Sequence, residues 1–174
     1  MVSLAIQRKV EQLSESKCKT YAVNTGHFES AMRDALELAR QAHQSGDVPV
    51  GAIVLDSQGQ IIGRGFNTRE VDHDPMSHAE VVAMRQAAVH LDSWRLDNCT
   101  LVVTLEPCTM CAGTAVQARI AEIVFGAFDE KAGAVGSLWD VVRDRRLPHR
   151  PTVVSGLLAE ECAQLLSNFF KEQR

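Results

Sequence analysis

The sequence predicts an α/β protein with three layers (α/β/α), in which a central mixed five-stranded sheet lies between helices on both faces. Three observations support this fold class. Some segments carry apolar side chains at helical spacing, short apolar runs of strand length lie between them, and the two kinds of segment alternate along most of the chain. The length of 174 residues fits one domain with a substantial core.

The first expected elements are a helix and a hairpin. The helix begins near Phe28, because apolar residues recur at helical spacing from that position, and Gly46 follows its end. The apolar runs at residues 50–56 and 60–67 flank a short turn that contains Gly59, so they predict two antiparallel strands.

The rest of the chain alternates between helices and strands. Residues 68–77 are polar and contain Asp74-Pro75, which predicts a loop. Helices are then expected at residues 78–90, 107–118 and about 159–171, and strands at residues 100–105, 123–127 and 152–155. The run TLVVTL at 100–105 is short and mostly apolar, which is typical of a strand inside a sheet.

The start of the chain differs from the rest. Residues 1–26 combine a short apolar pattern with a polar stretch and predict a loosely attached extension, open to disorder, while residues 27–174 form the folded domain. The N-terminus has neither the apolar block nor the cleavage site of a signal peptide, and no apolar run could span a bilayer. We therefore expect a cytoplasmic protein with no membrane partner. The net charge of −4 excludes a protein that coats DNA, although a local nucleic-acid surface stays open.

Two of the five cysteines form a candidate metal site together with a histidine. Cys108 and Cys111 lie three residues apart at the start of a helix, so they share one helix face, and the helix dipole favours their thiolates. His78 begins the preceding helix and offers a third ligand. One imidazole and two thiolates leave the fourth position of a zinc ion open for water, which is typical of a catalytic site. We expect one zinc ion in each chain, while Cys99 and Cys162 are expected to pack in the core.

Glu80 is the candidate catalytic residue. It follows His78 by two positions and can lie beside the metal without binding it. The pattern H-x-E followed by P-C-x-x-C is typical of hydrolytic zinc deaminases that act on nucleobases. In such a site Glu80 would carry a proton from the zinc-activated water to the base and to the leaving amine.

Each part of this pattern has another interpretation. Ser77 and Glu80 match a capping box, in which Glu80 would only bind helix amides. Cys108 and Cys111 could be the redox pair of a thiol–disulfide oxidoreductase, or half of a structural zinc site. A non-catalytic zinc-binding or RNA-binding module is a further alternative. The combined pattern favours the deaminase.

Several longer segments support that interpretation by resemblance. They are VPVGAIV (48–54), HAE (78–80), TLEPCTMCAG (104–113), RIAEIVFGAFD (119–129), KAGAVGSL (131–138) and ECAQLLSNFF (161–170). In these segments, and over about residues 28–172, the chain resembles the bacterial tRNA-specific adenosine deaminases (the TadA family) of the cytidine and deoxycytidylate deaminase superfamily. The resemblance implies a cytidine-deaminase-like fold and a homodimer. It also implies hydrolytic conversion of adenosine to inosine at the wobble position of a tRNA anticodon stem-loop, that of an arginine tRNA.

The resemblance also suggests residues that contact the RNA. Asn67 matches a position that hydrogen-bonds the target base, and Asp129 matches one that contacts the RNA backbone. Phe128 departs from the family, because a basic residue there would suit RNA better. The basic run at residues 143–150 could hold phosphates or be an ordinary solvated surface. A deaminase of a free base or nucleoside, such as guanine, cytosine or cytidine, would share the whole zinc site and is the main alternative.

Overall fold

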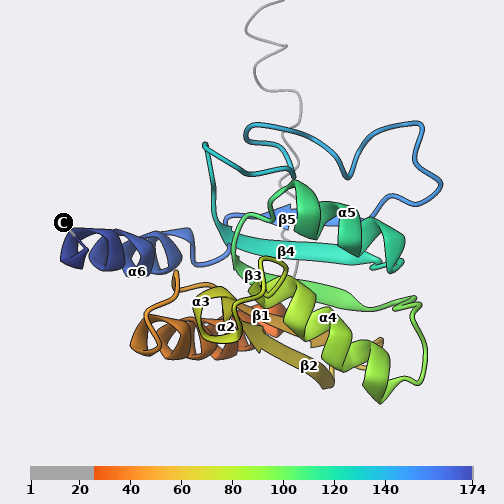
Figure 1. The fold of residues 1–174 in the computed structure, drawn as a ribbon. Helices are drawn as coiled ribbons and strands as arrows, with labels where there is room; N and C mark the ends of the chain where they lie inside the picture. The colour runs from red at the N-terminus through yellow and green to blue at the C-terminus, as the bar shows by residue number, and fades with distance from the viewer. Residues whose placement is uncertain (1–25, 174) are drawn as a thin grey trace, which may run out of the picture.

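One sheet organises residues 26–173, which are the residues that the computed structural model describes (Figure 1). Its strands are β1 (Gly51–Leu55), β2 (Ile61–Phe66), β3 (Thr100–Leu105), β4 (Glu122–Ala127) and β5 (Thr152–Ser155), and their order is β2-β1-β3-β4-β5. β1 pairs antiparallel with β2 and with β3, whereas β3, β4 and β5 are parallel. The sheet is therefore mixed and five-stranded over the described residues, as predicted.

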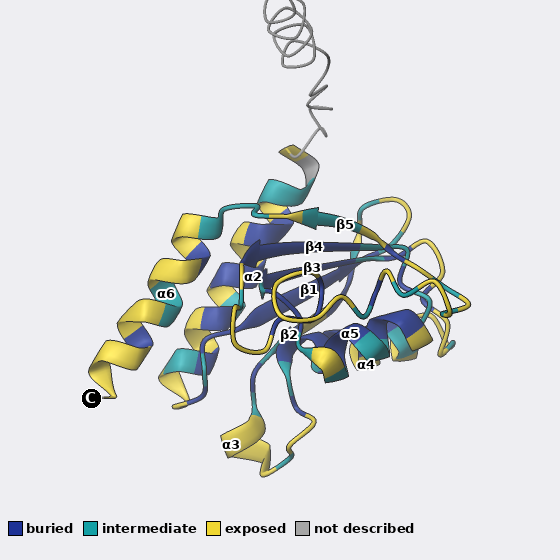
Figure 2. Cartoon of the chain, turned by 90° about the horizontal axis from the view of Figure 1, so that it is seen from above, coloured by how far each residue is buried: buried dark blue, intermediate teal, exposed yellow. Residues whose placement is uncertain are grey.

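Helices cover both faces of the sheet, which confirms the three-layer architecture. α2 (Gly26–Gln44) and α6 (Ala159–Glu172) lie on one face, and α4 (Ala79–His90) and α5 (Thr109–Gln117) lie on the other (Figure 2). Strand residues alternate between the two cores, because neighbouring side chains of a strand point to opposite faces. Ala52 and Val54 of β1 pack in the core beneath α4 and α5, whereas Ile53 and Leu55 pack beneath α2 and α6.

The strand directions bring the ends of several strands together. β2, β3 and β4 all run the same way, because β2 and β3 are both antiparallel to β1 and β4 is parallel to β3. α4 follows β2 after a loop, and α5 follows β3 directly, so the starts of both helices lie at the carboxyl edge of these strands. Binding sites in open α/β sheets form at this edge.

α4 lies very close to β2 because the strand is rich in glycine. A Cβ at Gly63 would come within 2.2 Å of the Ala83 carbonyl oxygen, and a Cβ at Gly65 within 2.3 Å of the Ala79 carbonyl oxygen. Only a residue without a side chain lets the helix backbone approach the strand so closely. The first turn of α4 is thereby fixed against the sheet.

The prediction of a loop over residues 68–77 is wrong in part. It contains the single helical turn α3 (Arg69–Asp72), which has no buried residue and projects from the layers (Figure 2). A four-residue helix shows no apolar periodicity, so the pattern could not reveal it. The other elements begin and end within two residues of their predicted bounds, and this includes the first helix, which was expected to start near Phe28 and begins at Gly26. The extension predicted over residues 1–26 lies outside the described residues, except for Gly26.

Candidate active site

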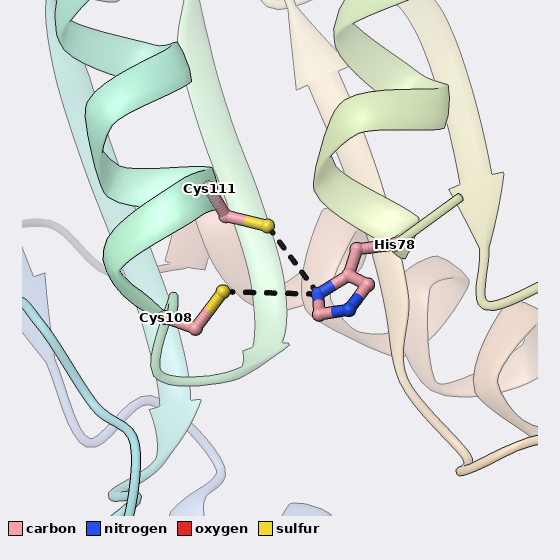
Figure 3. A group of neighbouring side chains, drawn as sticks. All are labelled: His78, Cys108 and Cys111. Atoms are coloured by element: carbon pink, nitrogen blue, oxygen red, sulfur yellow. Dashed lines mark hydrogen bonds between the residues drawn. The ribbon is translucent and has the colours of Figure 1, made fainter. Parts of the chain in front are cut away.

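The three predicted metal ligands meet at the starts of α4 and α5 (Figure 3). The Nδ1 atom of His78 lies 3.6 Å from the Cys111 sulfur and 3.8 Å from the Cys108 sulfur. Zinc bonds of ordinary length in a tetrahedral site place a nitrogen and a sulfur ligand about 3.6 Å apart. The donor types and their spacing therefore fit zinc with three protein ligands.

Both helices offer their first residues to this site. His78 is the N-cap residue of α4 and Cys108 is the N-cap residue of α5, and each has an extended backbone. Neither side chain makes the usual cap hydrogen bond to its own helix. Their side chains instead point toward each other, with Cys111 from the first turn of α5 beside them (Figure 3).

The two thiols sit in environments that favour one thiolate strongly. Hydrogen bonds from Cys111 and His78 lower the pKa of Cys108 to about 4, although burial opposes the shift. The pKa of Cys111 is raised, first by its hydrogen bond to Cys108 and then by burial. His78 has a raised pKa, mainly through its hydrogen bond to Cys108. Thiolates are the forms that bind zinc, so Cys108 is prepared for metal binding.

Glu80 lies in the first turn of α4 and is buried, with only 4% of its surface exposed. Burial raises the pKa of its carboxyl to about 7. A group with a pKa near neutrality can both accept and donate a proton under ordinary conditions. The capping box proposed for Ser77 and Glu80 is wrong, because the Ser77 hydroxyl donates to Asp74 at 3.0 Å and α4 has no side-chain cap.

A small cavity of about 140 Å³ opens onto these groups. Its walls include predicted site residues from four loops or helix starts, namely Asn67, His78, Glu80, Cys108 and Asp129. Cys111, the third predicted ligand, is fully buried behind them. Arg69 and Glu106 also line the cavity. Sequence reasoning did not single them out, although Glu106 stands directly before the Pro-Cys pair.

Asn67 is held firmly at the cavity wall. Its Oδ1 accepts the first backbone N–H of α4, at Ala79, over 2.9 Å, and its Nδ2 donates to the Val48 carbonyl over 3.0 Å. Asn67 thus stabilises the start of α4, where the N-cap side chain is directed elsewhere. An amide nitrogen carries two hydrogens, so one N–H has no partner among the described residues and is free to donate to a ligand.

Asp129 follows β4 and organises its own loop. Its Oδ1 accepts the backbone N–H groups of Lys131 at 2.9 Å and Ala132 at 3.1 Å. The preceding Phe128, where the sequence departs from the family, is 57% exposed and packs edge-on against Phe125. An aromatic surface therefore stands beside the cavity where a positive charge was expected.

The basic run at residues 143–150 is partly neutralised by two aspartates, one before the run and one within it. Arg143 pairs with Asp140 at 3.1 Å, and Arg146 pairs with Asp144 at 2.5 Å. None of these side chains lines the cavity. Cys99 and Cys162 are buried away from the metal ligands, as expected for packing residues. No helix among residues 26–173 is both long and apolar enough to cross a membrane.

The chain belongs to the cytidine and deoxycytidylate deaminase family of zinc-dependent hydrolytic deaminases, because the zinc-binding region of that family matches residues 26–127. Within the family it is similar to the tRNA-specific adenosine deaminase of Haemophilus influenzae, with 50% identity over 84% of each chain. A solved structure from a study of A-to-I editing by tRNA:A34 deaminases has 40% identity and a TM-score of 0.74, and the match covers 77% of this chain and 96% of that one. The guanine deaminase of Nitrosomonas europaea is more distant, with 27% identity and a TM-score of 0.69 over 81% of this chain and 83% of that one.

Proposed function

We propose that this protein converts adenosine to inosine at the wobble position of a tRNA anticodon, by hydrolysis. The observation that carries the proposal is the shared cavity, where a buried carboxylate with a pKa near 7 lies beside two thiols and an imidazole that fit zinc. This arrangement supports hydrolytic deamination. Similarity to tRNA-specific adenosine deaminases, at 50% identity for one of them, supports the choice of substrate.

The candidate metal ligands and Glu80 each have a proposed task. His78, Cys108 and Cys111 would hold the zinc ion, which when bound supplies a water activated for attack on the ring carbon that bears the amino group. Glu80 accepts the proton that the attacking water loses, at one of its carboxylate oxygens. It then donates that proton to the ring nitrogen. Next it accepts the remaining proton of the new hydroxyl and passes it to the amino group, so that the carbon–nitrogen bond breaks and ammonia leaves as the carbonyl forms. The burial of Glu80 keeps its carboxyl able to do both.

Further residues would hold the substrate. The free N–H of the Asn67 amide would donate to an acceptor on the target base, and Asp129 would contact the RNA backbone. Arg69 adds a positive charge at the cavity wall, where a phosphate could pair with it. We also propose that the protein is a homodimer in the cytoplasm, that it contains one zinc ion in each subunit and that its natural substrate is an arginine tRNA.

The test is a comparison of RNA turnover between the wild type and Glu80→Gln. Zinc-loaded protein is incubated with an arginine tRNA anticodon stem-loop that carries a wobble adenosine, and inosine is measured by mass spectrometry. Glu122→Gln is the matched control, because burial also raises the pKa of Glu122 but its side chain does not line the cavity. We expect Glu80→Gln to keep its zinc and to lose at least about 100-fold in rate, whereas Glu122→Gln should turn over like the wild type.

Two other results would change the assignment. No inosine from zinc-loaded wild type would refute the tRNA substrate, and free guanine, cytosine and cytidine would then be tested in the same assay. Full turnover by Glu80→Gln would refute the role of Glu80 while leaving the substrate in place. Zinc stoichiometry below one in Cys108→Ala, together with a normal value in wild type, would support the proposed ligand set against a thiol–disulfide function.

A further inference from the structure

A second buried carboxylate, Glu106, lines the same cavity as Glu80. Glu106 lies in the short connection between β3 and the start of α5, and only 2% of its surface is exposed. Burying an ionised carboxylate is costly unless hydrogen bonds compensate it. The structure therefore has to supply several donors at this position.

Those donors all come from the loop that follows β4. The backbone N–H groups of Val135 and Ser137 donate to one oxygen of Glu106, each at 3.0 Å. The Asp129 N–H donates to the other oxygen at 3.2 Å, and so does the Ser137 hydroxyl. A carboxylate has about four acceptor positions. The loop fills them all, so Glu106 has no acceptor left for a metal, a proton or a substrate.

The same loop is pressed against the start of the cysteine helix. Gly133 forms a backbone bridge with Cys108, and the N–H of Ala134 donates to the Pro107 carbonyl at 2.8 Å. A Cβ on Gly133 would lie 2.5 Å from the carboxyl carbon of Glu106, so only glycine allows this approach. The loop is thus attached both to Glu106 and to the segment that carries a metal ligand.

We propose that Glu106 is a positioning residue, whose saturated carboxylate holds residues 129–137 against the start of α5 and so forms the substrate wall that contains Asp129 and Ala132. This inference rests on the proposed function for its substrate. Glu106 neither carries protons nor binds zinc. Its loss should loosen the wall and weaken the binding of RNA, while the metal site stays intact.

Glu106→Gln tests the proposal because it keeps the shape of the side chain but replaces one acceptor oxygen with an NH₂ group. At least one backbone N–H of the loop then loses its acceptor. We expect amide hydrogen exchange in peptides that cover residues 129–137 to rise about tenfold in RNA-free protein, with one zinc ion retained in each chain. With the anticodon stem-loop, KM should rise about tenfold and kcat should change less. Ser137→Ala removes a single donor and should show smaller changes of the same kind, and Glu122→Gln should show none.

The readouts separate this proposal from the proposed function. Unchanged exchange of residues 129–137 in Glu106→Gln would overturn the anchoring role, and so would loss of zinc, which would place Glu106 in support of the metal helix instead. A fall in kcat with unchanged KM would also contradict it. If Glu106→Gln does not fold, Ser137→Ala decides by the same measurements. A wild type that produces no inosine would refute the proposed function, while the exchange result would still decide the anchoring.

Discussion

Replacement of Gly65 by alanine should displace the first turn of α4 and so disturb the active site. Gly65 lies in β2, and a Cβ there would stand 2.3 Å from the Ala79 carbonyl oxygen and 2.6 Å from the Ala83 nitrogen. The first distance is about 1 Å short of the 3.4 Å at which ordinary contact begins. Both neighbours are backbone atoms of a helix, so no side chain can rotate away, and the first turn of α4 has to move.

The size of the effect follows from what that turn carries. His78 and Glu80 are attached to it, so both shift relative to the cysteines on α5. Overpacking of this kind costs about 1–3 kcal/mol of folding free energy, and a misplacement of about 1 Å at a reacting group can lower the rate about 100-fold. We therefore expect Gly65→Ala to unfold at a lower temperature and to lose about two orders of magnitude in kcat/KM.

The control is a glycine at which the added methyl group of alanine touches no other atom. Gly113 lies within α5, and a Cβ there would meet nothing within 4 Å. Gly113→Ala should stabilise the helix by about 0.5–1 kcal/mol and leave turnover unchanged. Both variants are compared by thermal unfolding and by inosine formation. The reasoning fails if Gly65→Ala has the stability and the turnover of the wild type, because α4 would then have absorbed the added carbon without moving the site.

Three further changes test other parts of the structure. Asn67→Ala removes the acceptor of the Ala79 N–H, so it should lower the free energy of unfolding, measured by denaturant titration, by about 1 kcal/mol. It should also weaken substrate binding and raise KM, and an unchanged KM would argue against a contact with the base. Removal of zinc with a chelator should lower the unfolding temperature, since a ligand that binds only the folded state stabilises it, and scanning calorimetry should show recovery when zinc is returned. Cys162→Ala should retain one zinc ion by metal analysis but lose stability, because the Cys162 side chain is buried against Gly126 and Met32; loss of zinc would show that the ligand set is incomplete.

The sequence was most informative where chemistry and periodicity are both local. The strands and long helices have apolar patterns that identify them within two residues, and the spacing of Cys108 and Cys111 indicates a shared helix face. His78 could be added only through the combined motif, because nothing local shows that two helix starts meet. The structure supplies that step through the common direction of β2 and β3.

Other features depend on contacts that no local pattern contains. Glu106 looks like an ordinary acid beside a proline, and its importance comes from donors up to 31 residues away, at Ser137. The short helix α3 has no apolar periodicity, so it was predicted as loop. The Ser77 hydroxyl likewise donates to Asp74 and not to the start of α4, because the preceding loop brings Asp74 close to it.

If two N-cap residues are metal ligands, as proposed, the arrangement has a consequence for the newly made protein. A side-chain cap stabilises a helix start by about 1 kcal/mol, and neither His78 nor Cys108 provides one. Before zinc arrives, the start of α4 is held by Asn67, which accepts the Ala79 N–H, whereas the start of α5 has no side-chain cap and faces the cavity. Local opening should concentrate there, which would leave the ligands accessible to an incoming ion. Capture of the metal would then close the same region, so that maturation of the site and completion of the fold would be one event.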